Sequence, residues 1–285
     1  MPRLFCFGLG YTARRLALAL RAAGWEAAGT GRAGEPDAVP GVTLYRFDTD
    51  RPLDDAGVLA GATHLLTSVP PGEAGDPVLA HHAADIAGIA SLEWVGYLSA
   101  TSVYGDTGGA AVDETAPCLA TTARGRRRIA AEAEWLDTGL PVHVFRLAGI
   151  YGPGRSALDQ VRAGAARRID APGHLFSRIH VDDIVATLRA SMARPDPGAI
   201  YNVCDDEPAS SADVVAFACR LLGAAVPPAV PLEQADLSPM ARSFYVDRRR
   251  VLNDRIGTEL EVVLKYPDYR AGLAAILAEE SSRCR

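Results

Sequence analysis

The chain has 285 residues, which at about 150 residues per domain is enough for two domains, or for one large α/β domain with a smaller lobe. Hydrophobic residues make up 48% and charged residues 22%, a composition typical of a globular protein and not of a disordered or fibrous chain. The formal net charge of −6 argues against a nucleic-acid partner, because a phosphate backbone requires a basic protein surface.

The sequence predicts neither a membrane span nor a signal peptide. Arg14, Arg15 and Arg21 interrupt the most apolar early stretch, and the first residues are typical of a strand without a cleavage site. The five cysteines are scattered and never in Cys-x-x-Cys spacing, which disfavours a disulfide framework and a zinc site. We therefore expect a cytoplasmic protein without membrane contacts and without a bound metal.

Short apolar runs alternate along the chain with longer segments of helical periodicity, a pattern typical of βαβ units around a parallel sheet. Strands are expected at 4–7, 26–30, 43–47, 64–69, 94–99, 142–147 and 199–203. Helices are expected at 12–23, 53–60, 77–90, 122–137, 182–193 and 211–222, followed by a Pro-rich connector at 225–231 and a last helical pair near 248–256 and 269–279.

A glycine motif of the form Gly-x-Gly-x-x-Ala spans residues 8–13, between the first predicted strand and the first predicted helix. Its first glycine permits a tight turn, its second lets the backbone approach a pyrophosphate, and the alanine allows close packing of helix on strand. The free N–H groups at the helix start favour phosphate binding. The alternative is an ordinary strand-to-helix turn. The motif predicts dinucleotide binding through Gly8, Gly10, Tyr11, Thr12 and Ala13.

The end of the second predicted strand bears on which dinucleotide is bound. An acidic residue at this place accepts hydrogen bonds from the adenosine ribose, whereas an arginine pairs with a 2′-phosphate. The chain has Thr30 and Arg32 here, and no carboxylate before Glu35. This favours NADP through Arg32, with Thr30 as a second donor; NAD and a solvated loop arginine are the alternatives. Asp48, after the third strand, either accepts from the adenine amino group or caps a turn.

Further segments follow in a familiar order, at 98–105 (LSATSVYG), 146–154 (RLAGIYGPG), 179–183 (IHVDD) and 199–203 (AIYNV). With the glycine motif, they make the sequence resemble the extended short-chain dehydrogenase/reductases, the NAD(P)-dependent epimerase/dehydratase group. The resemblance implies that Ser68 and Ser99 line the middle of the cofactor site. It also implies a small-molecule substrate and pairing of two copies into a homodimer through long helices.

The predicted fold is α/β, a Rossmann-type doubly wound parallel sheet with a small mixed carboxyl-terminal substrate lobe. Residues 1–150 are expected to form the NAD(P)-binding core and residues 151–285 mainly the substrate lobe. Within the second part, residues 178–205 are expected to return to the sheet.

The catalytic positions of this family are where the sequence departs from the resemblance. Relatives use a Ser or Thr after the fifth strand and a Tyr-x-x-x-Lys pair on the next helix to move a proton as hydride moves. In this sequence the hydroxyl position falls on Ala100, the tyrosine position on Arg124 and the lysine position on Arg128. The only lysine in the chain is Lys265, so the usual relay is absent.

A guanidinium stays protonated near neutrality and does not act as a general acid or base, but it binds carboxylate or phosphate through paired N–H groups. The scarcity of lysine could explain Arg128, whereas it does not explain an arginine at the tyrosine position. The alternative for the whole cluster at 124–128 is an exposed basic helix face. By strand alternation, one of Thr101 and Ser102 is expected to face away from the site.

The sequence predicts an oxidoreductase or epimerase-type enzyme of atypical mechanism that acts on a small polar or sugar-like carbonyl compound. Thr101, Tyr104 and Arg128 are the catalytic candidates, and Arg124, Tyr151 and Arg155 the candidates for substrate binding. Core packing is the alternative for both tyrosines. The alternative function is a sensor or scaffold that binds NADP(H) without turnover.

Overall fold

A parallel sheet of seven strands forms the centre of the computed structural model, which describes residues 1–32 and 39–283. The strand order is β11-β7-β5-β4-β1-β2-β3, and it reverses between β1 and β4. This order confirms the predicted doubly wound, Rossmann-like fold, in which ligands bind beyond the carboxyl ends of the strands. The strands are β1 Arg3–Phe7, β2 Glu26–Gly31, β3 Thr43–Arg46, β4 His64–Thr67, β5 Trp94–Ala100, β7 Val142–Leu147 and β11 Ile200–Val203.

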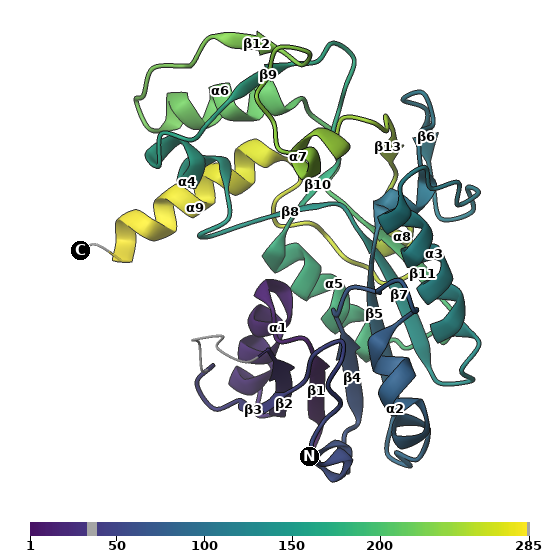
Figure 1. Ribbon diagram of the computed structural model, residues 1–285. Helices are drawn as coiled ribbons and strands as arrows, with labels where there is room; N and C mark the ends of the chain where they lie inside the picture. The colour runs from purple at the N-terminus through teal and green to yellow at the C-terminus, as the bar shows by residue number, and fades with distance from the viewer. Residues whose placement is uncertain (33–38, 284–285) are drawn as a thin grey trace.

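Helices cover both faces of the sheet (Figure 1). Helices α1 (Tyr11–Ala22) and α5 (Val181–Ala193) pack on one face, and α2 (Pro77–Ala87) and α3 (Ala123–Leu136) pack on the other. Strand β1 shows why both faces must be covered. Its Leu4 and Cys6 belong to the first apolar cluster and its Phe5 and Phe7 to the second, as the alternation of side chains along a strand requires.

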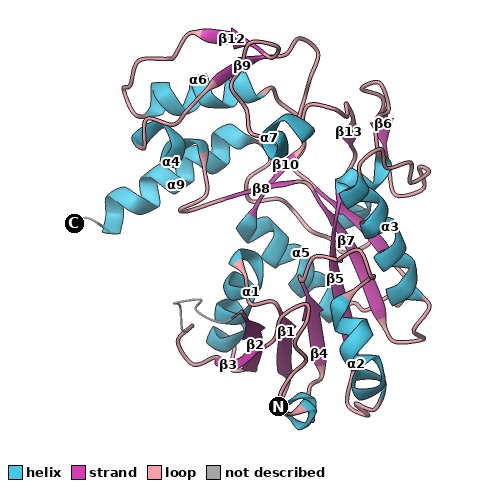
Figure 2. Ribbon diagram, in the orientation of Figure 1, coloured by secondary structure: helices cyan, strands magenta, loops and turns pink. Residues whose placement is uncertain are grey.

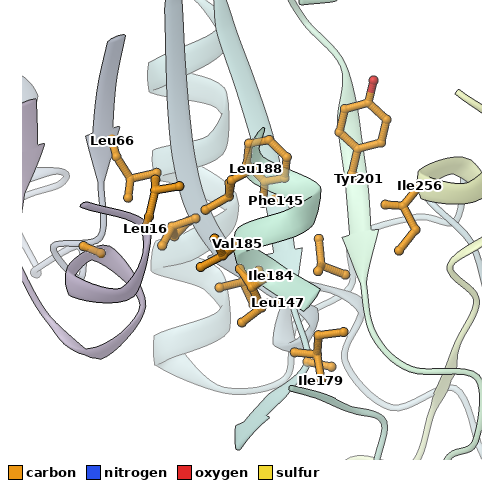
Figure 3. Close-up of a cluster of buried hydrophobic side chains, with 14 of the residues drawn as sticks. Leu16, Leu66, Phe145, Leu147, Ile179, Ile184, Val185, Leu188, Tyr201 and Ile256 are labelled. Carbon is orange, nitrogen blue, oxygen red and sulfur yellow. The ribbon is translucent and has the colours of Figure 1, made fainter. Parts of the chain in front are cut away.

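The first apolar cluster joins α1 and α5 to the sheet, as Figure 3 shows. Leu16 from α1 and Leu188 from α5 are fully buried beside Leu66 and Phe145 of the strands. Helix α5 leads directly into β11, which pairs with β7, so a segment late in the chain completes the sheet.

A smaller lobe lies beyond the carboxyl ends of the strands (Figure 2). Its helices are α4 Ala157–Arg162, α6 Ser211–Leu221, α7 Pro239–Ser243 and α9 Tyr269–Arg283, and β9 Arg168–Asp170 pairs with β12 Ala229–Pro231. The lobe has an apolar core of its own, in which Leu158, Val214 and Leu273 meet. The lobe therefore packs around an apolar core that is separate from the apolar clusters on the two faces of the sheet.

Short strand pairs and turns connect the two parts. Strand β8 (Gly149–Tyr151) pairs with β10 (Arg178–His180), and β6 (Ala111–Val112) pairs with β13 (Arg250–Val251). A 3₁₀ turn, η2 (Thr101–Tyr104), follows β5 directly.

Three predictions from local pattern differ from the structure. The helix predicted at 53–60 is only a 3₁₀ turn, η1 (Ala56–Leu59), in which Asp55 accepts from the Gly57 N–H. The helix predicted near 248–256 is β13 followed by the short α8 (Asp254–Thr258), and part of the connector at 225–231 is the strand β12. In the last two cases, pairing with distant strands overrides local propensity.

Among the described residues, no helix combines the length and the apolar character needed to cross a membrane. The described cysteines, Cys6, Cys118, Cys204 and Cys219, are free, and Cys284 lies outside the described residues.

Candidate functional site

The glycine turn between β1 and α1 is held by the ends of two neighbouring strands. Gly8 has a positive φ of 81°, and its N–H donates to Thr30 Oγ1 at 2.9 Å. Ser68 Oγ donates to the Gly8 carbonyl at 2.6 Å, and a Cβ on Gly8 would lie 2.8 Å from the same Oγ. The left-handed conformation and the close approach both require glycine at this position.

Gly10 differs from Gly8 because the space beside it is open. It is the N-cap of α1 at a φ of −82°, and it supplies no side chain to cap the helix. A Cβ on Gly10 would have nothing within 4 Å. The start of α1 therefore has no side-chain cap and has open space beside Gly10, and uncapped N–H groups at a helix start favour an anion.

The first residues of α1 have different surroundings. Thr12 and Ala13 are buried in the helix–sheet contact, whereas Tyr11 is half-buried. The Tyr11 hydroxyl donates to the Pro153 carbonyl at 3.0 Å, and the Arg155 guanidinium lies 5.7 Å from its ring centre. Tyr11 therefore joins the helix start to the 152–155 turn.

The other predicted cofactor residues differ in exposure. Thr30 is buried and uses its hydroxyl to hold the glycine turn. Arg32 is exposed just beyond β2, and Asp48 is exposed in a turn where its Oδ1 accepts from the Thr49 N–H at 2.8 Å. Ser99 is buried and donates to Glu132 Oε1, so its hydroxyl is engaged within the core.

A cleft of about 1080 Å³ lies between the sheet and the lobe. The sheet side contributes Ala100, Thr101 and Arg124, and the lobe contributes Val214 and Leu273 among others. The 152–155 turn lines the cleft through Gly154 and Arg155, and Tyr11 donates to Pro153 in the same turn, so the start of α1 lies next to the cleft without lining it. Tyr151 also lines it and donates to the Asp268 carbonyl at 3.3 Å, and burial raises the pKa of its hydroxyl.

The positions of the family's proton relay all line this cleft. Ala100 ends β5, and Thr101 and Ser102 both line the cleft next to it. The Ser102 hydroxyl is buried, and the strand ends at Ala100, where η2 replaces the alternation of side chains. On α3, Arg124 and Arg128 line the cleft.

The structure does not bring Tyr104 to the cleft. Its side chain is buried, its hydroxyl donates to Asn202 Oδ1 at 2.7 Å, and it accepts from Arg146 Nη1 at 3.0 Å. Burial raises the pKa of Tyr104 to about 12. Packing in the core, the alternative given above, describes its surroundings, and we leave Tyr104 out of the proposed site.

The residues around the cleft that the sequence did not single out come from distant segments. Arg178 and Arg249 line it, as do Phe176, Phe244 and Tyr245. The run of three arginines at 248–250 was a visible signal, and 176–178 directly precedes the 179–183 segment without a signal of its own. In the described part of the chain, no cluster of three or more His, Cys, Asp or Glu side chains could hold a metal ion.

A buried carboxyl group, Asp205, lies behind the cleft. Its backbone N–H donates to the carbonyl of Arg178 at 2.6 Å, and its side chain is 1% exposed. Burial raises the pKa of Asp205 to about 8, and the charge of Arg178 opposes this shift only in part. The native protein therefore keeps a proton at pH 6 or 7 that an unfolded aspartate, with a pKa of about 3.9, releases.

This proton gives a prediction about stability and pH. The raised pKa of Asp205 stabilises the folded protein fully below pH ~4. This stabilisation is lost as the pH rises through about 8, because between the two values the aspartate ionises only in the unfolded chain. The variant Asp205→Asn should be more stable than the wild type at pH 8, and the difference should shrink at pH 5. Urea unfolding at both pH values measures this, with the exposed Asp236→Asn as control. A difference between Asp205→Asn and the wild type that is the same at both pH values would contradict the assignment.

Comparison with known proteins supports the fold. No family model matches the chain. Two curated relatives are Protein YeeZ of Escherichia coli K12, 29% identical over 94% of this chain and 97% of the relative, and the 3-diazoavenalumate denitrifying reductase of a Streptomyces species. The second is 32% identical over 57% of this chain and 55% of its own length.

Solved structures match over almost the whole chain. A conserved protein of unknown function from Silicibacter pomeroyi DSS is 53% identical, with a TM-score of 0.91 and coverage of 98% of this chain and 99% of its own. A protein of Methylobacillus flagellatus, provisionally named an NAD-dependent epimerase/dehydratase, is 26% identical, with a TM-score of 0.75 and coverage of 98% and 99%. MoeE5 in complex with UDP-glucose and NAD is 19% identical, with a TM-score of 0.80 and coverage of 99% and 100%.

The sheet order, the glycine turn and the cleft below a small lobe define a doubly wound, Rossmann-like architecture. The structural relatives agree with this architecture. Over 98% of its length the chain is similar in fold to a protein named as an NAD-dependent epimerase/dehydratase.

Proposed function

We propose that the protein is an NAD(P)-dependent oxidoreductase of the epimerase/dehydratase kind that works without a tyrosine–lysine relay. The open turn before α1 is the observation that carries this proposal. A Cβ placed on Gly10 would have no protein atom within 4 Å, and the start of α1 has no side-chain cap. These features fit the pyrophosphate of a dinucleotide. The NAD complex of MoeE5 and the name of the Streptomyces reductase support the proposal by likeness.

The cofactor contacts that we propose follow the path from the turn to the cleft. Gly8, Gly10 and Tyr11, with the backbone of Thr12 and Ala13, hold the pyrophosphate, and Ser68 lies where the ribose passes. Arg32 pairs with the 2′-phosphate of NADP, and Asp48 accepts from the adenine amino group. Thr30 and Ser99 act indirectly, because their hydroxyls already hold Gly8 and Glu132.

A bound nicotinamide would supply or accept the hydride, and the chain's own residues would orient the substrate beside it. We propose that Arg128, at the lysine position, together with Arg155 and Tyr151, orients a small polar or sugar-like carbonyl substrate. Thr101 supplies a hydroxyl at the relay end of the cleft. Because Ala100 and Arg124 offer no proton near neutrality, the protein relies on Thr101 or on solvent for proton movement.

The same two positions favour a second candidate function. A sensor that binds NADP(H) needs the glycine turn but no proton relay, and Ala100 and Arg124 remove the relay from the cleft. An active-site structure with a titratable group within about 3 Å of a substrate oxygen would favour the enzyme. A structure with only arginines and apolar groups near that oxygen would favour the sensor.

Dinucleotide binding gives a direct test of both functions. A ligand present at 100 times its dissociation constant should raise the free energy of unfolding by about 2.7 kcal/mol, because it binds only the folded protein. Thermal-shift titrations with NADP, NADPH, NAD and NADH measure this effect. We expect the melting temperature to rise with NADP and NADPH, which carry the 2′-phosphate, and to rise less with NAD and NADH. No shift with any of the four would exclude both functions.

The preference for NADP depends on Arg32. Replacing Arg32 by Ala should reduce the affinity for NADP about tenfold or more, since a charge-assisted contact to the 2′-phosphate is lost, and should leave NAD binding unchanged. Arg3→Ala, at the start of β1 and so at the opposite end of that strand from the glycine turn, is the control. If Arg32→Ala still prefers NADP tenfold, another residue must bind the 2′-phosphate.

A further inference from the structure

The charge of the cleft is opposite to that of the chain. The chain carries a net charge of −6, yet the described lining includes six arginines against two aspartates. Both aspartates are engaged: Asp247 lies 3.1 Å from Arg249 Nη1, and Asp159 accepts from the N–H of Ser156. A concave site lined by one sign of charge concentrates ligands of the opposite sign. The arginines are Arg124, Arg128, Arg155, Arg167, Arg178 and Arg249.

The two arginines at the relay positions have no acidic partner among the residues that the structure describes. Arg124 Nη1 contacts Met240 Sδ at 3.0 Å, and Arg128 Nη1 donates to the Leu98 carbonyl at 2.5 Å. The neighbouring Arg127 does not line the cleft and pairs with Glu73 at 2.6 Å. The helix therefore neutralises an arginine away from the cleft and leaves the cleft-facing pair without a counter-charge.

The position of this pair in α3 is unfavourable unless an anion is present. Arg124 lies in the first turn of the helix, where the helix dipole disfavours a cation, and that turn contains no acidic residue. Arg124 and Arg128 are four residues apart, so two like charges lie on one helix face. A carboxylate or phosphate between them would remove the repulsion and would also bind favourably near the helix start.

An apolar surface adjoins the charged one. The Arg124 guanidinium lies 4.9 Å from the centre of the Phe244 ring. Phe244 is 51% exposed and Met240 is 59% exposed, although both line the cleft, and Phe176 and Tyr245 line it nearby. Rings and a thioether in a concave site favour a flat apolar ligand, while the adjoining arginine fixes its charged end.

We propose that the substrate of this oxidoreductase is an organic anion with an aromatic body. Its carboxylate or phosphate binds Arg124 and Arg128, and its ring lies against Phe244 and Met240. The proposal rests on the function proposed above and assigns the substrate class of the same site. Arginine at the tyrosine position then has a positive role, which is to hold the anionic end of the substrate where relatives hold a proton donor.

The test uses simple probes on the full chain with saturating NADP. Cinnamate and phenyl phosphate carry a ring and a charge, cinnamamide carries the ring alone, and acetate and inorganic phosphate carry the charge alone. We expect cinnamate or phenyl phosphate to bind at least tenfold more tightly than the three other probes, as measured by calorimetry. Which of the two binds better distinguishes a carboxylate from a phosphate substrate. Equal binding of cinnamamide, or no binding of either aromatic anion, overturns the proposal.

Two variants on one helix locate the binding site. Arg124→Gln should weaken the preferred aromatic anion at least tenfold and leave its neutral analogue unchanged. The matched control is Arg126→Gln, because Arg126 lies on the same turn, is exposed and does not line the cleft. Equal affinities of the two variants for the anion would contradict the role of Arg124.

Titration with NADP alone separates this proposal from the function on which it rests. Arg124→Gln should keep the wild-type affinity for NADP. If NADP binds but the probes do not discriminate, only the substrate class is wrong. If the aromatic anions bind but no dinucleotide does, the oxidoreductase function fails while the anion site stands.

Discussion

Replacing Glu132 by Gln is expected to lower the free energy of unfolding by about 3 to 5 kcal/mol, because the buried guanidinium of Arg146 loses its counter-charge. The carboxylate of Glu132, on α3, lies 2.8 Å from Arg146 Nη2 on β7, and both side chains are at most 6% exposed. Ser99 on β5 donates to the same carboxylate, and Arg146 also donates to Tyr104. One charge pair therefore ties α3 to two central strands.

Urea unfolding at neutral pH measures this loss. The matched control is Glu73→Gln, which breaks the pair with Arg127 on the exposed side of the same helix and should cost less than about 1 kcal/mol. Adding Arg146→Met to Glu132→Gln removes the unpaired charge, so part of the lost stability should return. If Glu132→Gln costs no more than the control, the pair does not hold α3 on the sheet.

The sheet could be predicted from the sequence because its signals are local. Strands buried on both faces appear as short apolar runs, and the helices between them have apolar residues at helical spacing. The glycine turn was also predictable, since its glycines stand at a fixed spacing after a strand and the positive φ of Gly8 favours glycine.

Elements that depend on a distant partner were not predictable in this way. Arg250–Val251 forms a strand only because it pairs with Ala111–Val112, and Ala229–Pro231 only because it pairs with β9. Distant partners also explain why the hydroxyls of Ser99 and Tyr104 are buried. Their sequence position suggested the site, but their partners, Glu132 and Asn202, lie far along the chain and draw them into the core.

The cleft shows the same division. The sequence predicted Arg124 and Arg128 as site residues because they fall on the relay positions of the helix, and Arg155 follows directly after the 146–154 segment. Arg178 and Arg249 were not predicted as site residues, and only the packing of the lobe on the sheet brings them to the cleft. The positive charge of the site is therefore a property of the tertiary structure, while the net charge of the chain has the opposite sign.

Replacing Gly10 by Ala is expected to reduce dinucleotide affinity about tenfold or more, or about 1.4 kcal/mol, while the fold remains. The backbone at Gly10 suits any residue, with a φ of −82°, and an added Cβ meets no protein atom within 4 Å. The stability without ligand should fall by about 1 kcal/mol, because alanine is a poorer N-cap than glycine. The methyl group would also occupy space that the pyrophosphate needs.

Thermal-shift titration with NADP and urea unfolding without it measure the two effects separately. Gly257→Ala, in α8 away from the turn, is the matched control and should bind NADP like the wild type. Gly8→Ala should behave differently from Gly10→Ala and lose more stability without ligand, because its φ of 81° and the Oγ of Ser68 at 2.8 Å leave no room for a Cβ. If Gly10→Ala binds NADP with unchanged affinity, the phosphates do not lie against the start of α1, and the cofactor must bind elsewhere or not at all.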